Sequence, residues 1–152
     1  MRKNERGFAV AWGVLLLAFV MFFTAGVYTL ADRRARGAAR ELLATDLRLA
    51  AESGLIAAAA ELTSDVSRRD AVNNASGEVV FAALTEGDIT TTVFLKKDGA
   101  GGFYGQATAG TKRLLSWEKN SKNSLGTRVI GRIGKKTAPD GTEKYTVTYW
   151  GH

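Results

Sequence analysis

The feature that most constrains this chain is the run of uncharged residues 7–31, which follows a short polar start at residues 1–6. About 20 consecutive apolar residues are enough for an α-helix to cross the hydrocarbon core of a bilayer. Trp12 and Tyr28 lie near the two ends of the run, where amphipathic rings favour the headgroup region. The sequence therefore predicts a transmembrane helix half over residues 8–31.

The helical pattern continues beyond this run. Residues 32–62 are rich in alanine, leucine, arginine and glutamate and contain no proline, with Gly37 and Gly54 as the only weak positions. We expect them to form a soluble half of the same helix.

Two apolar stripes run along this soluble half. At 100° per residue, Leu42, Leu49 and Ile56 fall within about 40° of one another. Nearly opposite them lie Leu43, Leu47, Leu55 and Leu62. A helix that only covers its own domain needs one stripe. The second stripe predicts packing against another subunit, or alternatively a cover made of loops from the same chain.

The rest of the chain changes to a strand-like period. Residues 63–77 are polar and predict the end of the helix and a linker, and residues 78–152 predict an antiparallel β head. The expected strands form three hairpins: 79–84 with 89–95, 103–108 with 111–117 through Ala109 and Gly110, and 127–134 with 144–150 around residues 139–142. The fold class is thus α+β, with a long N-terminal helix packed on a C-terminal antiparallel sheet.

The net charge of +6 comes entirely from residues 111–152, which carry nine basic and three acidic side chains. This excess suggests a surface for DNA or another anionic partner. Its members would be Lys112, Arg113, Arg128, Arg132, Lys135 and Lys136. An ordinary solvated strand face has the same alternation of basic and apolar residues, and we favour that interpretation over nucleic-acid binding.

No combination of residues indicates an active site. The chain has no cysteine, and its one histidine is His152. Asp88, Asp98 and Asp140 fall in expected turns, where aspartate supports local backbone hydrogen bonds. We therefore expect no catalytic residue, no cofactor and no metal ion.

The N-terminal pattern resembles that of the type IV pilin superfamily, which includes pilins and the pseudopilins of type II secretion and competence systems. The matching features are the basic residues Arg2, Lys3 and Arg6, then Gly7 and Phe8, the apolar run and the continuing helix. The resemblance implies that prepilin peptidase removes a leader of residues 1–7. It would cut between Gly7 and Phe8 and methylate the new amine of Phe8.

Two further positions refine the resemblance. Residues 51–55 are similar to an Ala-Glu-small-Gly-aliphatic stretch of tip-class minor pilins, such as the K-type pseudopilin of secretion systems. Trp12 occupies the fifth mature position, where major pilins usually have a glutamate that pairs with a neighbour's terminal amine. The resemblance thus implies a minor subunit at or near a filament tip. The kink-forming proline of many pilins is missing, because the only proline is Pro139.

The resemblance also implies partners and a location. The partners would be other pilins or pseudopilins, prepilin peptidase, an inner-membrane assembly platform and membrane lipid. The chain would span a bacterial inner membrane once, with its N-terminus cytoplasmic and its head outside, and would then enter a filament in the periplasm or at the cell surface. The machine, whether pilus, secretion or competence system, stays open.

One charge pattern favours the reverse orientation. Four arginines after the span outnumber the three basic residues before it, and positive charges concentrate on the cytoplasmic side. The four are Arg33, Arg34, Arg36 and Arg40. A second function class also stays open: a single-pass anchored binding module for DNA or an envelope partner that does not polymerise.

Overall fold

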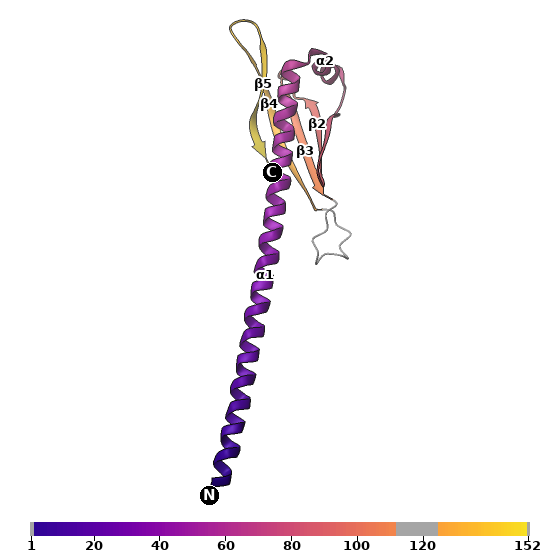
Figure 1. Ribbon diagram of the computed structural model, residues 1–152. Helices are drawn as coiled ribbons and strands as arrows, with labels where there is room; N and C mark the ends of the chain where they lie inside the picture. Colours follow the sequence, from indigo (N-terminus) through magenta and orange to yellow (C-terminus); the bar gives the residue numbers. More distant parts are fainter. Residues whose placement is uncertain (1, 112–124, 152) are drawn as a thin grey trace. The chain divides into compact units, whose positions relative to one another are not determined.

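The computed structural model of the chain describes residues 2–111 and 125–151, and the side chains of residues 7–111 and 125–148 (Figure 1). The elements in this part are α1 (Arg2–Ser64), α2 (Val66–Asn74), β1 (Val79–Glu86), β2 (Ile89–Lys97), β3 (Phe103–Thr111), β4 (Leu125–Thr137) and β5 (Glu143–Gly151). The chain divides into two compact units, Met1–Leu42 and Leu43–His152. We call them the N-terminal unit and the C-terminal unit.

The described residues of the N-terminal unit, 2–42, form a single stretch of helix α1. All its large apolar side chains from Phe8 to Leu30 are exposed by at least 51%. Thr24 and Thr29 lie within this stretch and donate their hydroxyl protons to carbonyl groups of the preceding turn, at 2.6 and 2.8 Å. The helix is long and apolar enough to cross a membrane, consistent with a single-pass anchor or a signal sequence.

In the C-terminal unit, the end of α1 packs on one face of a five-stranded antiparallel sheet. The strand order is β1-β2-β3-β4-β5, so every neighbour in the sheet is also a neighbour in the sequence. One apolar cluster fills the space between helix and sheet. Its largest fully buried side chains include Leu47, Leu55 and Leu62 of α1 and Val93, Leu95, Phe103, Val129 and Ile133 of the sheet. The α+β fold predicted from the sequence, a pilin-like architecture, is confirmed.

Two of the three predicted hairpins are confirmed. β1 and β2 meet through the two-residue turn at Gly87 and Asp88, where Gly87 has a φ of +58° that favours glycine. β4 and β5 pair around residues 139–142, also as expected.

The turn predicted for the third hairpin was wrong. Ala109 and Gly110 lie inside β3, which runs unbroken to Thr111 and pairs with β4. Close approach of the helix accounts for a glycine elsewhere on this strand, at Gly105, where a Cβ atom would lie 2.7 Å from Leu55 Cδ2. The remainder of the expected strand at 111–117 lies outside the described residues.

The predicted linker 63–77 contains a second helix, α2. Asp65 is its N-cap, because its carboxylate accepts a hydrogen bond from the backbone N–H of Arg68 at 3.1 Å. The hydroxyl of Ser67 donates to the same oxygen at 2.6 Å, and these bonds lower the pKa of Asp65 below its ordinary value. Val72 is buried and fixes α2 against the core. The expectation of a connecting loop was therefore wrong for residues 66–74.

Candidate assembly surface

The two apolar stripes of α1 differ sharply in burial. Leu47, Leu55 and Leu62 are at most 1% exposed and form the helix side of the core. Leu49 and Ile56 are 57% and 56% exposed, and Leu42, in the N-terminal unit, is 67% exposed. No described loop of the C-terminal unit covers Leu49 or Ile56, so the predicted cover from the same chain is not found in the described residues.

Small side chains surround Leu49 and Ile56 on the solvent side of the helix. Ser53, Ala57 and Ala60 are exposed there. The hydroxyl of Ser53 donates to the carbonyl of Ala50 at 2.9 Å, so it does not require an external acceptor. We call Leu49, Ser53, Ile56, Ala57 and Ala60 the outer face. Its low relief and apolar character suit close packing against another helix.

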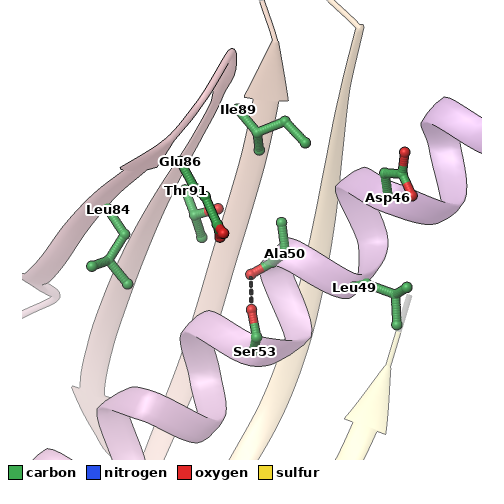
Figure 2. A pocket seen from close by; sticks show the side chains of 8 residues that line it. All are labelled: Asp46, Leu49, Ala50, Ser53, Leu84, Glu86, Ile89 and Thr91. Carbon is green, nitrogen blue, oxygen red and sulfur yellow. Dashed lines mark hydrogen bonds between the residues drawn. The ribbon is translucent and has the colours of Figure 1, made fainter.

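A groove borders the outer face on the side of the first hairpin. It has a volume of about 450 Å³ and is shown in Figure 2. Its lining residues are Asp46, Leu49, Ala50 and Ser53 from α1, Leu84 and Glu86 from β1, and Ile89 and Thr91 from β2. We call it the hairpin groove. Each side of the groove combines apolar side chains with one carboxylate.

A second hollow borders the outer face on the side of β5. It has a volume of about 370 Å³ and is lined by Ile56, Ala59, Ala60, Tyr145, Thr146 and Val147. The outer face thus lies between two concave strips. A protein surface docking on it would gain contact area on both sides.

The residues predicted for leader processing lie together on α1. Gly7 has no neighbouring atom within 4 Å of where a Cβ would stand. Phe8 and Trp12 are 67% and 55% exposed, and their rings meet edge to face with centroids 6.2 Å apart. Their predicted roles in cleavage and methylation stay predictions.

The predicted basic patch is largely paired within the chain. Lys112 and Arg113 lie outside the described residues. Arg128 donates to Gln106 Oε1 at 2.5 Å, and Lys135 forms an ion pair with Glu143 at 2.5 Å. The hydrogen bond to Glu143 raises the pKa of Lys135 and lowers that of Glu143. For Lys136 the structure adds no partner within the described part.

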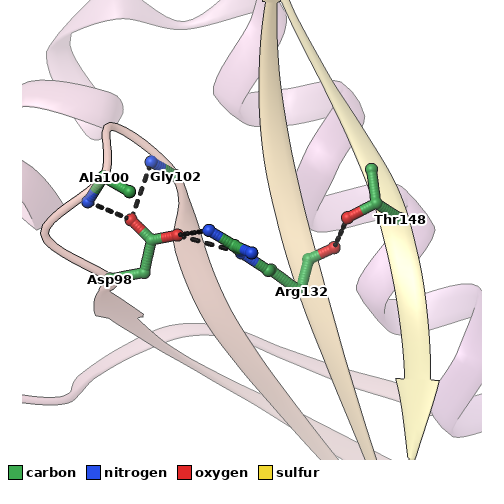
Figure 3. A network of polar contacts seen from close by, with 5 residues as sticks. All are labelled: Asp98, Ala100, Gly102, Arg132 and Thr148. Atoms are coloured by element: carbon green, nitrogen blue, oxygen red, sulfur yellow. Dashed lines mark hydrogen bonds and ion pairs between the residues drawn. The ribbon is translucent and has the colours of Figure 1, made fainter.

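Arg132, also predicted for the patch, belongs to a network around Asp98 (Figure 3). Its guanidinium donates twice to Asp98 Oδ2, at 3.0 and 3.1 Å, while Asp98 Oδ1 accepts from the backbone N–H groups of Ala100 and Gly102 at 2.8 and 2.9 Å. The Asp98 side chain is 1% exposed, and although desolvation acts to raise its pKa, these four bonds lower it. This network fastens the loop between β2 and β3 to β4. Arg132 is thus engaged in structure.

The turn role of Asp98 was predicted from the sequence, but its pairing with Arg132 was missed. The two residues are 34 positions apart, and only the order of the strands brings them together. Predicting this pair would have required the register between β3 and β4, which places Tyr104 opposite Arg132.

Among the described residues, no three or more His, Asp or Glu side chains are grouped so that they could hold a metal ion. Comparisons with models of protein families, with curated proteins and with solved structures give no match. The candidate functional surface of the C-terminal unit is therefore the outer face, an apolar helix face between two hollows.

Proposed function

We propose that this chain is a structural minor subunit of a type IV pilin-like filament, cleaved after Gly7, stored in the inner membrane and assembled at or near the filament tip. The main support for this proposal is the exposed outer face. Leu49 and Ile56 are more than half exposed on a helix whose other side is fully committed to its own core. Exposed apolar stripes of this kind are expected where another chain packs.

The N-terminal residues support the same proposal. Exposed apolar side chains from Phe8 to Leu30 need lipid or a protein partner, because water solvates them poorly. A filament subunit would use this segment twice, first in the bilayer and then against neighbouring helices.

Trp12 supports a minor role. A carboxylate buried among apolar helices needs a partner of opposite charge. With tryptophan at this position, a subunit offers no such charge to a neighbour's terminal amine. It therefore suits a place where no subunit has to be added above it.

The alternative of an anchored DNA-binding module gains no support from the described basic residues. Two of the four described members of the predicted patch form ion pairs with carboxylates, and a third donates to an amide. We therefore propose no second function.

Mass spectrometry of the full chain, purified from membranes of cells that carry it naturally, tests the proposal. The expected mature chain begins at N-methylated Phe8 and keeps residues 8–31. Gly7→Leu should block the cut and exclude the chain from sheared filaments. Gly13→Leu is the matched control, because both glycines have open space around them, and it should be processed normally.

Two results would overturn the proposal. A chain that keeps Met1 through Gly7 in every preparation would be an anchored module. A chain cut after residue 31 would identify the apolar run as a signal sequence.

A further inference from the structure

We propose that the hairpin groove of one copy binds the basic helix segment just after the apolar run of a second copy, with Arg33 and Arg34 pairing with Asp46 and Glu86. The inference rests on the proposed function, because it names the partner of the outer face and its position along the helix.

The groove has apolar and acidic side chains on both of its sides, one side formed by α1 and the other by the first hairpin. Leu49, Leu84 and Ile89 supply apolar contacts, and Asp46 from α1 and Glu86 from β1 supply the charges (Figure 2). Opposite charges placed across an interface fix its register and exclude wrong partners. An occupant that fits both walls must therefore carry an apolar ridge between two cations.

The carboxylates of Asp46 on α1 and Glu86 on β1 differ from three other carboxylates of α1. Asp32, Glu52 and Glu61 each form an ion pair with an arginine of their own chain. Neither Asp46 nor Glu86 has an ion-pair partner in the part of the chain that the structure describes. Their charges are thus available to another chain.

The segment after the apolar run has the complementary pattern. At 100° per residue, Leu30 and Gly37 lie on one line of α1, with Arg33 on one flank and Arg34 on the other. Leu30 is 51% exposed, both arginines are exposed, and Gly37 has open space around it. This ridge of one apolar and one very small residue between two cations matches a groove with an acidic residue on each side.

The pairing requires an offset between copies. Position 33 precedes position 46 by thirteen residues, about 20 Å of rise in an α-helix. Two copies resting at the same depth in a bilayer cannot make this contact. It forms when one copy has moved outward relative to the other, as filament assembly demands. The contact is heterologous, since groove and ridge are different surfaces, and it provides intersubunit charge pairing outside the lipid.

Cysteine crosslinking in cells tests the contact directly, because the natural chain has no cysteine. Full-length Leu84→Cys and Gly37→Cys copies, with different tags, are produced together in cells that carry the chain naturally. We expect a crosslinked species containing both tags. Val80→Cys is the control: it lies on the same strand and is 61% exposed, but it does not line the groove. Its yield with Gly37→Cys should be at least tenfold lower.

Charge reversal gives a second readout. Asp46→Arg with Glu86→Arg in the Leu84→Cys copy should lower the crosslink yield at least fivefold. Arg33→Glu with Arg34→Glu in the Gly37→Cys copy should then restore it. Equal yields from Val80→Cys and Leu84→Cys, a failed restoration, or a Leu84→Cys crosslink only to a different protein would overturn the inference.

Failure of this inference and failure of the proposed function give different results. If processing to N-methylated Phe8 and recovery in filaments persist while the crosslink is absent, only the groove contact is refuted. If the chain keeps residues 1–7, the proposed function itself is refuted.

Discussion

The backbone N–H of Tyr145 donates a hydrogen bond to Thr63 Oγ1 at 3.0 Å, joining edge strand β5 to the last turn of α1. Thr63 in turn donates its hydroxyl proton to the carbonyl of Ala59 at 2.9 Å. An edge strand presents unpaired backbone groups on one side. This bond satisfies one of them and sets the end of the helix against the sheet, beside the ring contact of Tyr145 with Phe103.

Replacing Thr63 with valine should show how much this hydrogen bond contributes to the free energy of unfolding. Thr63→Val keeps the shape but leaves the N–H of Tyr145 without its acceptor, so the free energy of unfolding should fall by about 1–3 kcal/mol. Denaturant unfolding of the full chain in detergent, followed by circular dichroism, measures it. Thr63→Ser retains the oxygen and should stay within about 0.5 kcal/mol of the natural chain. Equal losses in the two variants would show that the hydroxyl is not responsible.

A methyl group at Gly54 should strain the contact between helix and sheet. Its Cβ would lie 2.9 Å from Thr91 Cγ2 and 3.2 Å from Val93 Cγ2, both stiff branched side chains. Gly54→Ala should lower the free energy of unfolding by about 1–3 kcal/mol, partly offset by up to about 1 kcal/mol of helix propensity.

Two further variants control the Gly54 prediction in the same unfolding assay. Thr91→Ser removes the nearer methyl group and should recover part of the loss when combined with Gly54→Ala. Gly37→Ala has open space around it and should not destabilise the chain. If the Gly54→Ala chain is as stable as the natural one, the side chains of Thr91 and Val93 must move to make room for the added methyl group.

Removing the charge of Asp98 should destabilise the C-terminal unit in a pH-dependent way. Asp98→Asn weakens bonds to Arg132 and to the loop N–H groups, so at neutral pH it should cost about 1–3 kcal/mol of unfolding free energy. Asp88→Asn, at an exposed turn position, should cost little.

The sign of the pH effect follows from the lowered pKa of Asp98. A carboxyl whose pKa is lower in the folded chain stabilises the fold above its unfolded value, near 3.8, and this contribution is lost as pH falls through the folded pKa. The free energies of unfolding of the natural chain and of Asp98→Asn should therefore approach each other as the pH falls below about 3.8. A constant difference at all pH values would contradict the role of the charge.

Polar substitutions on the outer face should separate assembly from folding. Leu49→Ser with Ile56→Ser removes exposed apolar surface, so the unfolding free energy should change by about 0.5 kcal/mol or less per site. Recovery of the chain in sheared filaments should fall at least tenfold. Leu55→Ala is the opposite case: its fully buried side chain should cost about 2–5 kcal/mol in folding. Normal recovery of the double variant would refute the assembly surface.

Much of the fold could be read from the sequence because its signals are periodic. The spacing of Leu47, Leu55 and Leu62 identified the buried side of α1, and the spacing of Leu49 and Ile56 identified the exposed side. Turn residues around Gly87 and Pro139 marked two hairpins correctly. These features depend on local geometry alone.

The parts that were missed depend on contacts between distant residues. Ala109 and Gly110 suggested a turn, yet both lie inside β3 and pair with Thr127 and Gly126 of β4. Helix α2 has a weak apolar pattern and is fixed by the Asp65 cap and by Val72. Pairing of the predicted patch residues with Asp98 and Glu143 requires the strand order, which no local signal gives.

The order of elements along the chain has a consequence for biogenesis. α1 is synthesised first, and the strands that bury Leu47, Leu55 and Leu62 follow one after another, with β4 contributing Val129 and Ile133 only near the end. A nascent chain released before β4 would therefore have only β1, β2 and β3 to cover these leucines, and part of the hydrophobic core would be exposed. Transiently exposed apolar surface of this kind promotes aggregation, so the chain is most vulnerable to aggregation before β4 is made.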